Sequence, residues 1–128
     1  MIQRFIELGE GYGDIFELCE LAKVNKSRIH RAFIFTSKKQ EQEYCSIAVA
    51  LKPVNNANFF PIYICLEGIP KTTTISKRLS TFNETLEELS IVPVHMDIKH
   101  STTFVDKGLF YQYVIGILRL NHFIPPLQ

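Results

Sequence analysis

Apolar positions that recur every three or four residues predict helices in two parts of the chain. Between Ile75 and Leu89 the spacings are 4, 3, 4 and 3, and charged residues fill the opposite side. This pattern indicates an amphipathic helix with one buried face. Another helix is expected from Asp14 to about Val24, because Asp14 and Glu17 match a capping box.

Alternating or continuous apolar runs predict five strands. "YCSIAVAL" has large residues on one face and small ones on the other, which favours a closely packed helix on the small face. "FFPIYICL" is apolar on both faces, as in a strand buried on both sides. "RIHRAFIFT" is expected to place Ile29, Phe33 and Phe35 on one face, and residues 2–8 form a short first strand. The last strand, "IVPVHMDI", has four residues expected to point inward: Val92, Val94, Met96 and Ile98.

The order of these elements predicts an α+β fold. With a third helix near the C-terminus it is β-α-β-β-β-α-β-α. A strand, a helix and a strand in succession favour a right-handed crossover between parallel strands. We therefore expect one globular domain over residues 1–128, with a mixed four- to five-stranded sheet packed with helices.

The chain ends on its most apolar stretch, "YQYVIGILRLNHFIPPLQ". Asp106 is a good N-cap for a helix there. Around that helix Gln112, Gly116 and Arg119 fall in one narrow sector, and apolar side chains fill nearly all the rest. The longest run without a polar side chain, "YVIGIL", is far shorter than the roughly 20 residues of a membrane span. We expect no contact with a membrane.

A helix that is apolar around most of its circumference must be covered on more than one side. Two arrangements satisfy this requirement. The helix lies under the sheet with "HFIPPLQ" folded back over it, or it leaves one stripe for a second subunit. In the second case the expected dimer face consists of Tyr113, Gly116, Ile117 and Leu120.

Charge and cysteine content narrow the class of protein. Fourteen basic and thirteen acidic residues give a net charge of +1, which provides no general attraction to nucleic acid or anionic lipid. Cys19, Cys45 and Cys65 are isolated, and we expect buried thiols of a reducing compartment. Glu7 and Glu10 interrupt the apolar run that a signal peptide needs, so a cytoplasmic protein is expected.

The stretch "VHMDIKHSTT" holds the best candidate for a ligand or metal site. His95 and Asp97 share one face of a strand, and His100 follows in the loop. Glu67 would emerge at the same edge if its strand were parallel and adjacent. These groups could bind a divalent metal or perform acid-base chemistry. Their spacing matches no recognised ligand motif, so a structural His95–Asp97 pair is the plainer interpretation, and we expect no cofactor.

Two other stretches have structural explanations. "GEGYGD" lacks the spacing of a phosphate loop and reads as a turn into the first helix. "KVNKSRIHR", with Lys38 and Lys39, could form a basic patch, but no aromatic residues interleave to stack on bases. Binding of nucleic acid is therefore not expected.

Three segments carry a resemblance to a known family: "MIQRFIELGEGYGDIFELCELAK", "FFPIYICLEGIP" and "YQYVIGILRLNHFIPPLQ". They resemble small uncharacterised proteins of Bacillus and related Firmicutes, over the full length of the chain. Some members carry the label methylthioribose kinase. The sequence does not support that label, since it has no H-R-D or D-F-G motif and 128 residues cannot hold two kinase lobes. The resemblance implies a bacterial cytoplasmic protein.

From residue 14 onward, the order α-β-β-β-α-β is similar to the core of restriction-endonuclease-like nucleases. Those enzymes hold magnesium with an Asp on the second core strand and an acidic-x-Lys motif on the third. Here "YCSIAVAL" contains no acid, and Lys71 follows Glu67 by four residues instead of two. The resemblance therefore implies a shared strand order without nuclease activity.

The sequence favours a non-catalytic interaction or regulatory module that associates with itself or with an unknown protein. A metal- or small-molecule-dependent enzyme is the first alternative, with its site at Glu67, His95, Asp97 and His100. A catalytically degenerate, nuclease-like nucleic-acid binder is the second.

Overall fold

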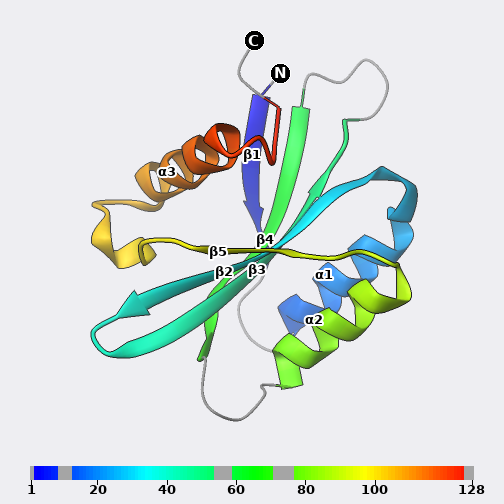
Figure 1. Cartoon of the computed structure of the whole chain (residues 1–128), viewed down its shortest axis with the longest axis horizontal. Helices are drawn as coiled ribbons and strands as arrows, with labels where there is room; N and C mark the ends of the chain where they lie inside the picture. The colour runs from blue at the N-terminus through cyan, green and yellow to red at the C-terminus, as the bar shows by residue number, and fades with distance from the viewer. Residues whose placement is uncertain (1, 9–12, 54–58, 71–76, 126–128) are drawn as a thin grey trace.

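The computed structural model describes residues 2–8, 13–53, 59–70 and 77–125, and within them five strands form one mixed sheet. The strand order is β1-β4-β3-β2-β5 (Figure 1). β1 is parallel to β4 and β5 is parallel to β2, whereas β2, β3 and β4 form an antiparallel meander. The strands are β1 (Ile2–Glu7), β2 (Ile29–Lys39), β3 (Gln42–Leu51), β4 (Phe59–Pro70) and β5 (Val94–Asp97).

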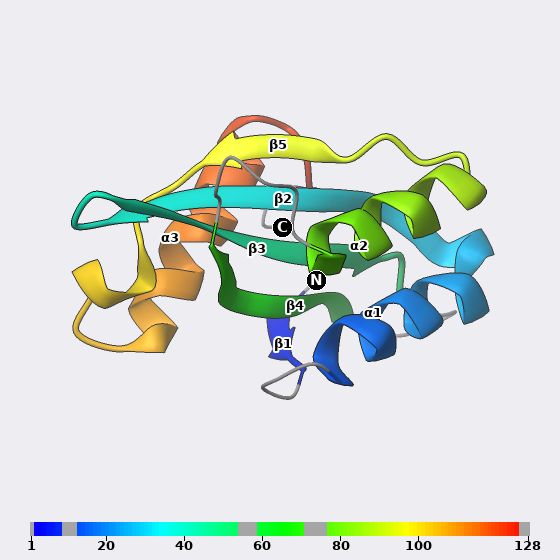
Figure 2. The ribbon, with the colours of Figure 1, turned by 90° about the horizontal axis from the view of Figure 1, so that it is seen from below.

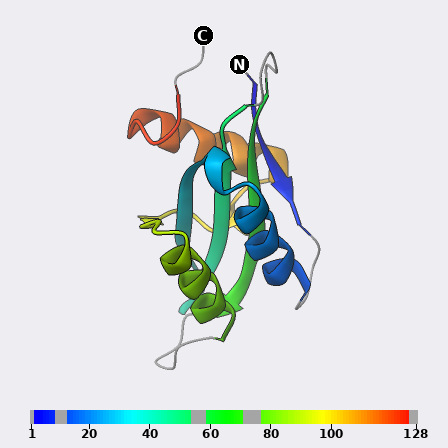
Figure 3. The ribbon, with the colours of Figure 1, turned by 90° about the vertical axis from the view of Figure 1, so that its right-hand side faces the viewer.

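Helices cover both faces of this sheet. α1 (Gly13–Val24) and α2 (Lys77–Glu88) lie side by side on one face, and α3 (Lys107–Leu120) crosses the other (Figures 2 and 3). Two 3-10 turns complete the order, η1 (Lys26–Arg28) and η2 (Ser101–Thr103). The expected α+β class and the order of helices and strands are confirmed.

The first core lies between the sheet and the α1–α2 layer. The predicted large face of β3 supplies Cys45, Ile47, Val49 and Leu51 to it. From the helices come Leu18 of α1 and four residues of the predicted buried face of α2, Leu79, Phe82, Leu86 and Leu89. Ile75, the first residue of that predicted face, lies outside the described residues. As expected, the three cysteines are buried; Cys19, Cys45 and Cys65 all belong to this core.

The second core lies between the opposite face of the sheet and α3. Ala48 and Ala50 of β3 lie on this face, and α3 buries Phe110, Val114 and Leu118 against it. Small residues on the sheet let the helix approach closely, as the sequence predicts. The Asp106 side chain caps α3 by accepting a hydrogen bond from the Leu109 amide at 2.9 Å. None of the described helices is long and apolar enough to cross a membrane.

Two predicted strand faces are wrong in part. A bulge between Ile29 and Arg31 of β2 inserts an extra residue, so Ile29 packs in the first core while Phe33 and Phe35 pack in the second. Val92 is 88% exposed because β5 begins only at Val94, after Pro93, so Val92 lies in the connection that precedes the strand.

The candidate ligand site required β5 to lie next to β4, and this prediction is wrong because β5 pairs with β2. Both edges of β4 are already paired, one with β3 and the other with β1. The chain therefore passes through α2 to the far side of the meander, where β5 pairs with β2. β4 and β5 remain parallel in direction, but β3 and β2 separate them.

Candidate functional site

His95 and Asp97 both lie on the edge strand β5, and both side chains are exposed. Side chains alternate between the two faces of a strand. Val94 and Met96 pack against the α3 core, so His95 and Asp97 point away from it. The structure therefore keeps these two predicted residues together on one face, next to Ile34 and Thr36 of β2.

The other two residues predicted for that site lie elsewhere. His100 is buried on the α3 side, where its ring contacts that of Tyr44 and its Nδ1 accepts a hydrogen bond from the Thr102 amide at 3.2 Å. The backbone of Glu67 belongs to β4, two strands away from β5, and its side chain lies outside the described residues. Among the described side chains, no three His, Cys, Asp or Glu groups lie close enough together to hold a metal ion.

The basic residues proposed as a patch are placed at opposite ends of β2. Lys38 and Lys39 lie at its hairpin end, and Arg28 and Arg31 lie at its beginning. The guanidinium of Arg28 donates to the Lys52 carbonyl, and that of Arg31 donates to the Phe123 carbonyl. These arginines serve the fold, and the two groups of cations do not form one surface.

The predicted turn "GEGYGD" lies mostly outside the described residues. α1 begins at Gly13, so Asp14 is already a helical residue, and its side chain is likewise outside the described part of the structure.

A polar seam joins the edge strand β1 to α3. Gln3 of β1 is only 7% exposed, and both ends of its amide are bonded. Its Oε1 accepts from Arg119 Nε at 2.7 Å, and its Nε2 donates to the Pro125 carbonyl at 2.7 Å. One buried amide thus fixes both the end of α3 and the segment that follows it.

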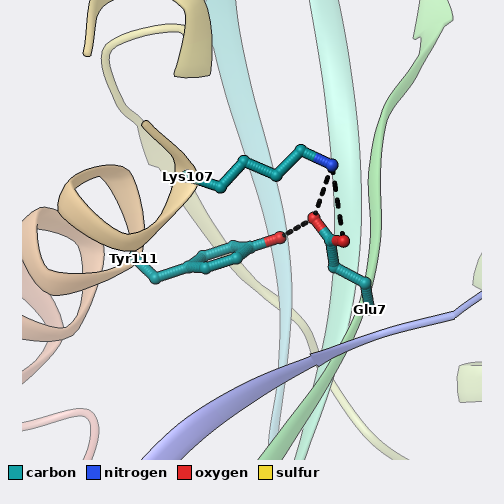
Figure 4. A network of polar contacts seen from close by, with 3 residues as sticks. All are labelled: Glu7, Lys107 and Tyr111. Carbon is teal, nitrogen blue, oxygen red and sulfur yellow. Dashed lines mark hydrogen bonds and ion pairs between the residues drawn. The ribbon is translucent and has the colours of Figure 1, made fainter. Parts of the chain in front are cut away.

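The same seam continues at the other end of β1, as Figure 4 shows. Tyr111 of α3 donates a hydrogen bond to the Glu7 carboxylate, and Lys107 forms an ion pair with it at 3.2 Å. The ring of Phe5 stacks on that of Tyr111 with centroids 4.7 Å apart. The polar side chains of β1 therefore hold α3 in place, a role that the alternation in residues 2–8 did not reveal.

The segment after α3 is fastened to the beginning of β2. The carbonyl of Phe123 accepts hydrogen bonds from His30 Nε2 at 3.1 Å and from Arg31 Nε at 3.0 Å. The bulge in β2 brings both side chains to this face. Burial lowers the pKa of His30, the hydrogen bond to Phe123 opposes that shift, and the charges of Arg31 and Lys52 add to it.

The four residues of the expected dimer face do not share one environment. Tyr113 is half-buried, and its hydroxyl accepts a hydrogen bond from the Lys99 amide at 3.1 Å. Ile117 and the Tyr113 ring both pack against the second core. Leu120 is 80% exposed, and a Cβ placed on Gly116 would meet no atom within 4 Å. Of the expected face, Leu120 is exposed and the Cβ direction of Gly116 is open, although Gly116 itself is half-buried.

Gly116 lies at the centre of the outward face of α3. It is two residues from both Val114 and Leu118, or about 200° around the helix from each of these buried side chains. Leu109, which the sequence did not single out, is 46% exposed on the same stripe. We define the outward face of α3 as Leu109, Gly116 and Leu120.

The two glycines of α3 differ in what the fold requires of them. A Cβ on Gly108 would lie 3.1 Å from Asp106 Oδ1, the atom that caps the helix, so a side chain there would crowd the cap. No such contact exists at Gly116. Packing within the chain therefore explains why residue 108 is a glycine, but it does not explain why residue 116 is one.

These features define a mixed α+β domain whose distinctive surface is an exposed helix face. A family described as a domain of unknown function, DUF7147, matches residues 1–124, and the chain belongs to this family. This agrees with the resemblance of the sequence to an uncharacterised family. No curated protein and no solved structure matches the chain.

Proposed function

We propose that this chain is a non-catalytic module of the bacterial cytosol that acts as a homodimer, with the outward face of α3 as its contact surface. The observation that carries the proposal is Gly116. A glycine inside a helix costs about 0.5–1 kcal/mol relative to alanine, yet a side chain would fit here without conflict. Contact with a second helix would explain why a glycine is kept at position 116, because two helix backbones can approach closely where there is no side chain.

The composition of the surface supports the same proposal. Leu109 and Leu120 are exposed on either side of Gly116. The charged side chains of α3 are directed elsewhere, Lys107 to Glu7 and Arg119 to Gln3. The centres of protein interfaces are depleted of charged residues in this way.

Three further observations support the non-catalytic role, the cytosolic location and the expected strength of the dimer. The polar residues of β1 and α3 bond to one another and so hold the helix that carries the surface. The three buried thiols fit a reducing compartment. A helix of 14 residues is only about 21 Å long, so the contact is smaller than a standard interface and dissociation in the micromolar range is expected.

Sedimentation velocity over a wide range of concentrations tests the proposal. The wild type should move from a mass of 14.8 kDa toward twice that value as concentration rises. Gly116→Leu should remain monomeric, because its side chain would occupy the space between the helices, and its Cβ would meet no atom of its own chain within 4 Å. Phe16→Ser is the matched control, since Phe16 is 63% exposed on α1, in the other helical layer.

The control should dimerise like the wild type. A wild type that remains monomeric at every concentration would contradict the proposal. Dissociation by Phe16→Ser, with Gly116→Leu still dimeric, would move the contact surface to α1.

A further inference from the structure

The segment that follows α3 covers part of the second core. We define the C-terminal strap as residues 122–125, which turn sharply away from the end of the helix (Figure 1). Ile124 of the strap is 2% exposed and belongs to the second core. The Phe123 ring contacts that of Phe33, with centroids 6.4 Å apart. Release of the strap would therefore open this core to water.

The bend at which the strap begins is strained. The amides of His122 and Phe123 donate to the carbonyls of Arg119 and Leu118, at 3.1 and 2.9 Å, which is the Schellman pattern of a helix C-terminus. Glycine is the usual residue at the bend because the φ angle there is positive. Here the exposed His122 takes this place with a φ of 61°, a conformation unfavourable for a residue with a side chain. Opening of the strap would relieve this strain.

Three side chains of the sheet hold the strap by two of its backbone carbonyls. Gln3 donates to the Pro125 carbonyl at 2.7 Å. His30 Nε2 and Arg31 Nε share the Phe123 carbonyl, at 3.1 and 3.0 Å. Because a carbonyl oxygen only accepts hydrogen bonds, neutral His30 must carry its proton on Nε2, and a second proton would enter at Nδ1. Protonation therefore adds a charge beside Arg31 but no new bond to the strap.

The charged groups around His30 are all cationic. Arg31 follows it on β2 and Lys52 follows β3, and the charges of both act against a proton on the ring. From β4 comes the ring of Phe60, whose centroid is 5.2 Å from that of the imidazole. The end of α3 adds another cation, Arg119. Within the described part of the chain, no carboxylate forms an ion pair with any of these groups.

This environment makes the closed strap a poor place for a charged imidazole. Burial lowers the pKa of His30, and Arg31 and Lys52 add to that shift against the hydrogen bond to Phe123. An open strap would expose the ring to water, so the open state takes up the proton first and gains population as pH falls below about 6.5.

We infer that the strap is a pH-sensitive cover of the second core, closed while His30 is neutral and released when His30 gains a proton. The strained bend at His122 and the shared Phe123 carbonyl are the two parts of this device. It goes beyond the proposed function and does not depend on a second copy of the chain.

Amide hydrogen exchange of the full chain, followed by NMR, tests the inference. Protection factors, which correct for the effect of pH on intrinsic exchange, are compared for Phe123 in the strap and Val49 in the buried strand β3. The Phe123 amide should be less protected than that of Val49 at every pH, because the strap opens without the rest of the fold. Its protection should fall roughly threefold or more between pH 7.5 and 5.5.

Three variants assign the effect. His30→Gln keeps a neutral donor for the Phe123 carbonyl, so its strap should stay protected at both pH values. His95→Gln is the matched control, because His95 is an exposed histidine on β5, and it should retain the wild-type dependence on pH. His122→Gly should raise the protection of the strap at both pH values, since glycine adopts a positive φ without strain.

A Phe123 amide as well protected as that of Val49 would show that the strap opens only with the whole fold, and would overturn the inference. So would a wild-type protection factor that does not change with pH, or an equal fall in His30→Gln. The wild type also gives a test without substitutions, because the imidazole of His30 and the amide of Phe123 should titrate with one midpoint. Separate midpoints would refute the link between them.

Discussion

Replacing Gly116 by alanine should stabilise the folded monomer. The new methyl group would meet nothing within 4 Å, so the change acts on helix propensity, which favours alanine by about 0.5–1 kcal/mol. With an unfolding entropy of about 2.1 cal/mol/K per residue over 128 residues, the melting temperature should rise by about 2–4 °C. Thermal and urea unfolding of dilute protein, where the dimer is dissociated, would measure this gain.

Gly108→Ala is the matched control within the same helix. Its methyl group would lie 3.1 Å from the capping oxygen of Asp106, and a disturbed cap costs about 0.5–2 kcal/mol. The propensity gain should therefore be cancelled or reversed at position 108. At high concentration Gly116→Ala should lose part of the extra stability that dimerisation gives to the wild type. A dilute Gly116→Ala variant less stable than the wild type would show that the fold itself needs this glycine, which removes the main support for the proposed surface.

Three further predictions concern the interior. Gln3→Ala should destabilise the chain by about 1–3 kcal/mol in urea unfolding, because Arg119 and the half-buried Pro125 carbonyl lose their partner; an unchanged midpoint would show that the seam is dispensable. Stability should fall as pH drops below about 6.5, since burial lowers the pKa of His30 and the unfolded chain therefore takes up that proton first. His30→Gln should flatten this dependence, measured by urea unfolding between about pH 5 and 7.5, and an unaltered slope would assign it to other groups. The three thiols should react with a disulfide reagent only as fast as the chain opens, because burial raises the pKa of Cys19 and excludes the reagent from all three; rapid labelling of the native protein would contradict this.

Much of the fold could be predicted because its signals are local. The two faces of β3, the buried side of α2 and the Asp106 cap all follow from the spacing of residue types within one segment. The place of Ile29 could not be predicted, because one extra residue in a bulge reverses the face of everything before it. The neighbour of β5 depends on the competition of three other strands for the edges of β4, which no local pattern records.

The candidate surface on α3 was likewise predictable only in part from local sequence patterns. Of the predicted dimer face, Leu120 is 80% exposed and a Cβ on Gly116 would meet no atom within 4 Å, and whether a second copy covers them stays a prediction. Ile117 was expected beside them but packs inward, because a helix that is apolar on nearly every side does not reveal which sector meets the sheet. That sector is fixed by β1, where Gln3 and Glu7 bind Arg119, Lys107 and Tyr111 across 100 or more residues of sequence.

The central claim is that α3 meets a second copy of the chain through its outward face, and photo-cross-linking inside bacterial cells tests it most directly. A benzophenone amino acid is placed at position 120 in one variant and, as a control, at the 88% exposed position 92 in another. Irradiation of the first variant should give one adduct of twice 14.8 kDa that disappears when Gly116→Leu is added, and the control should give none. No adduct from position 120, or an equal yield of the same adduct from position 92, would contradict the claim.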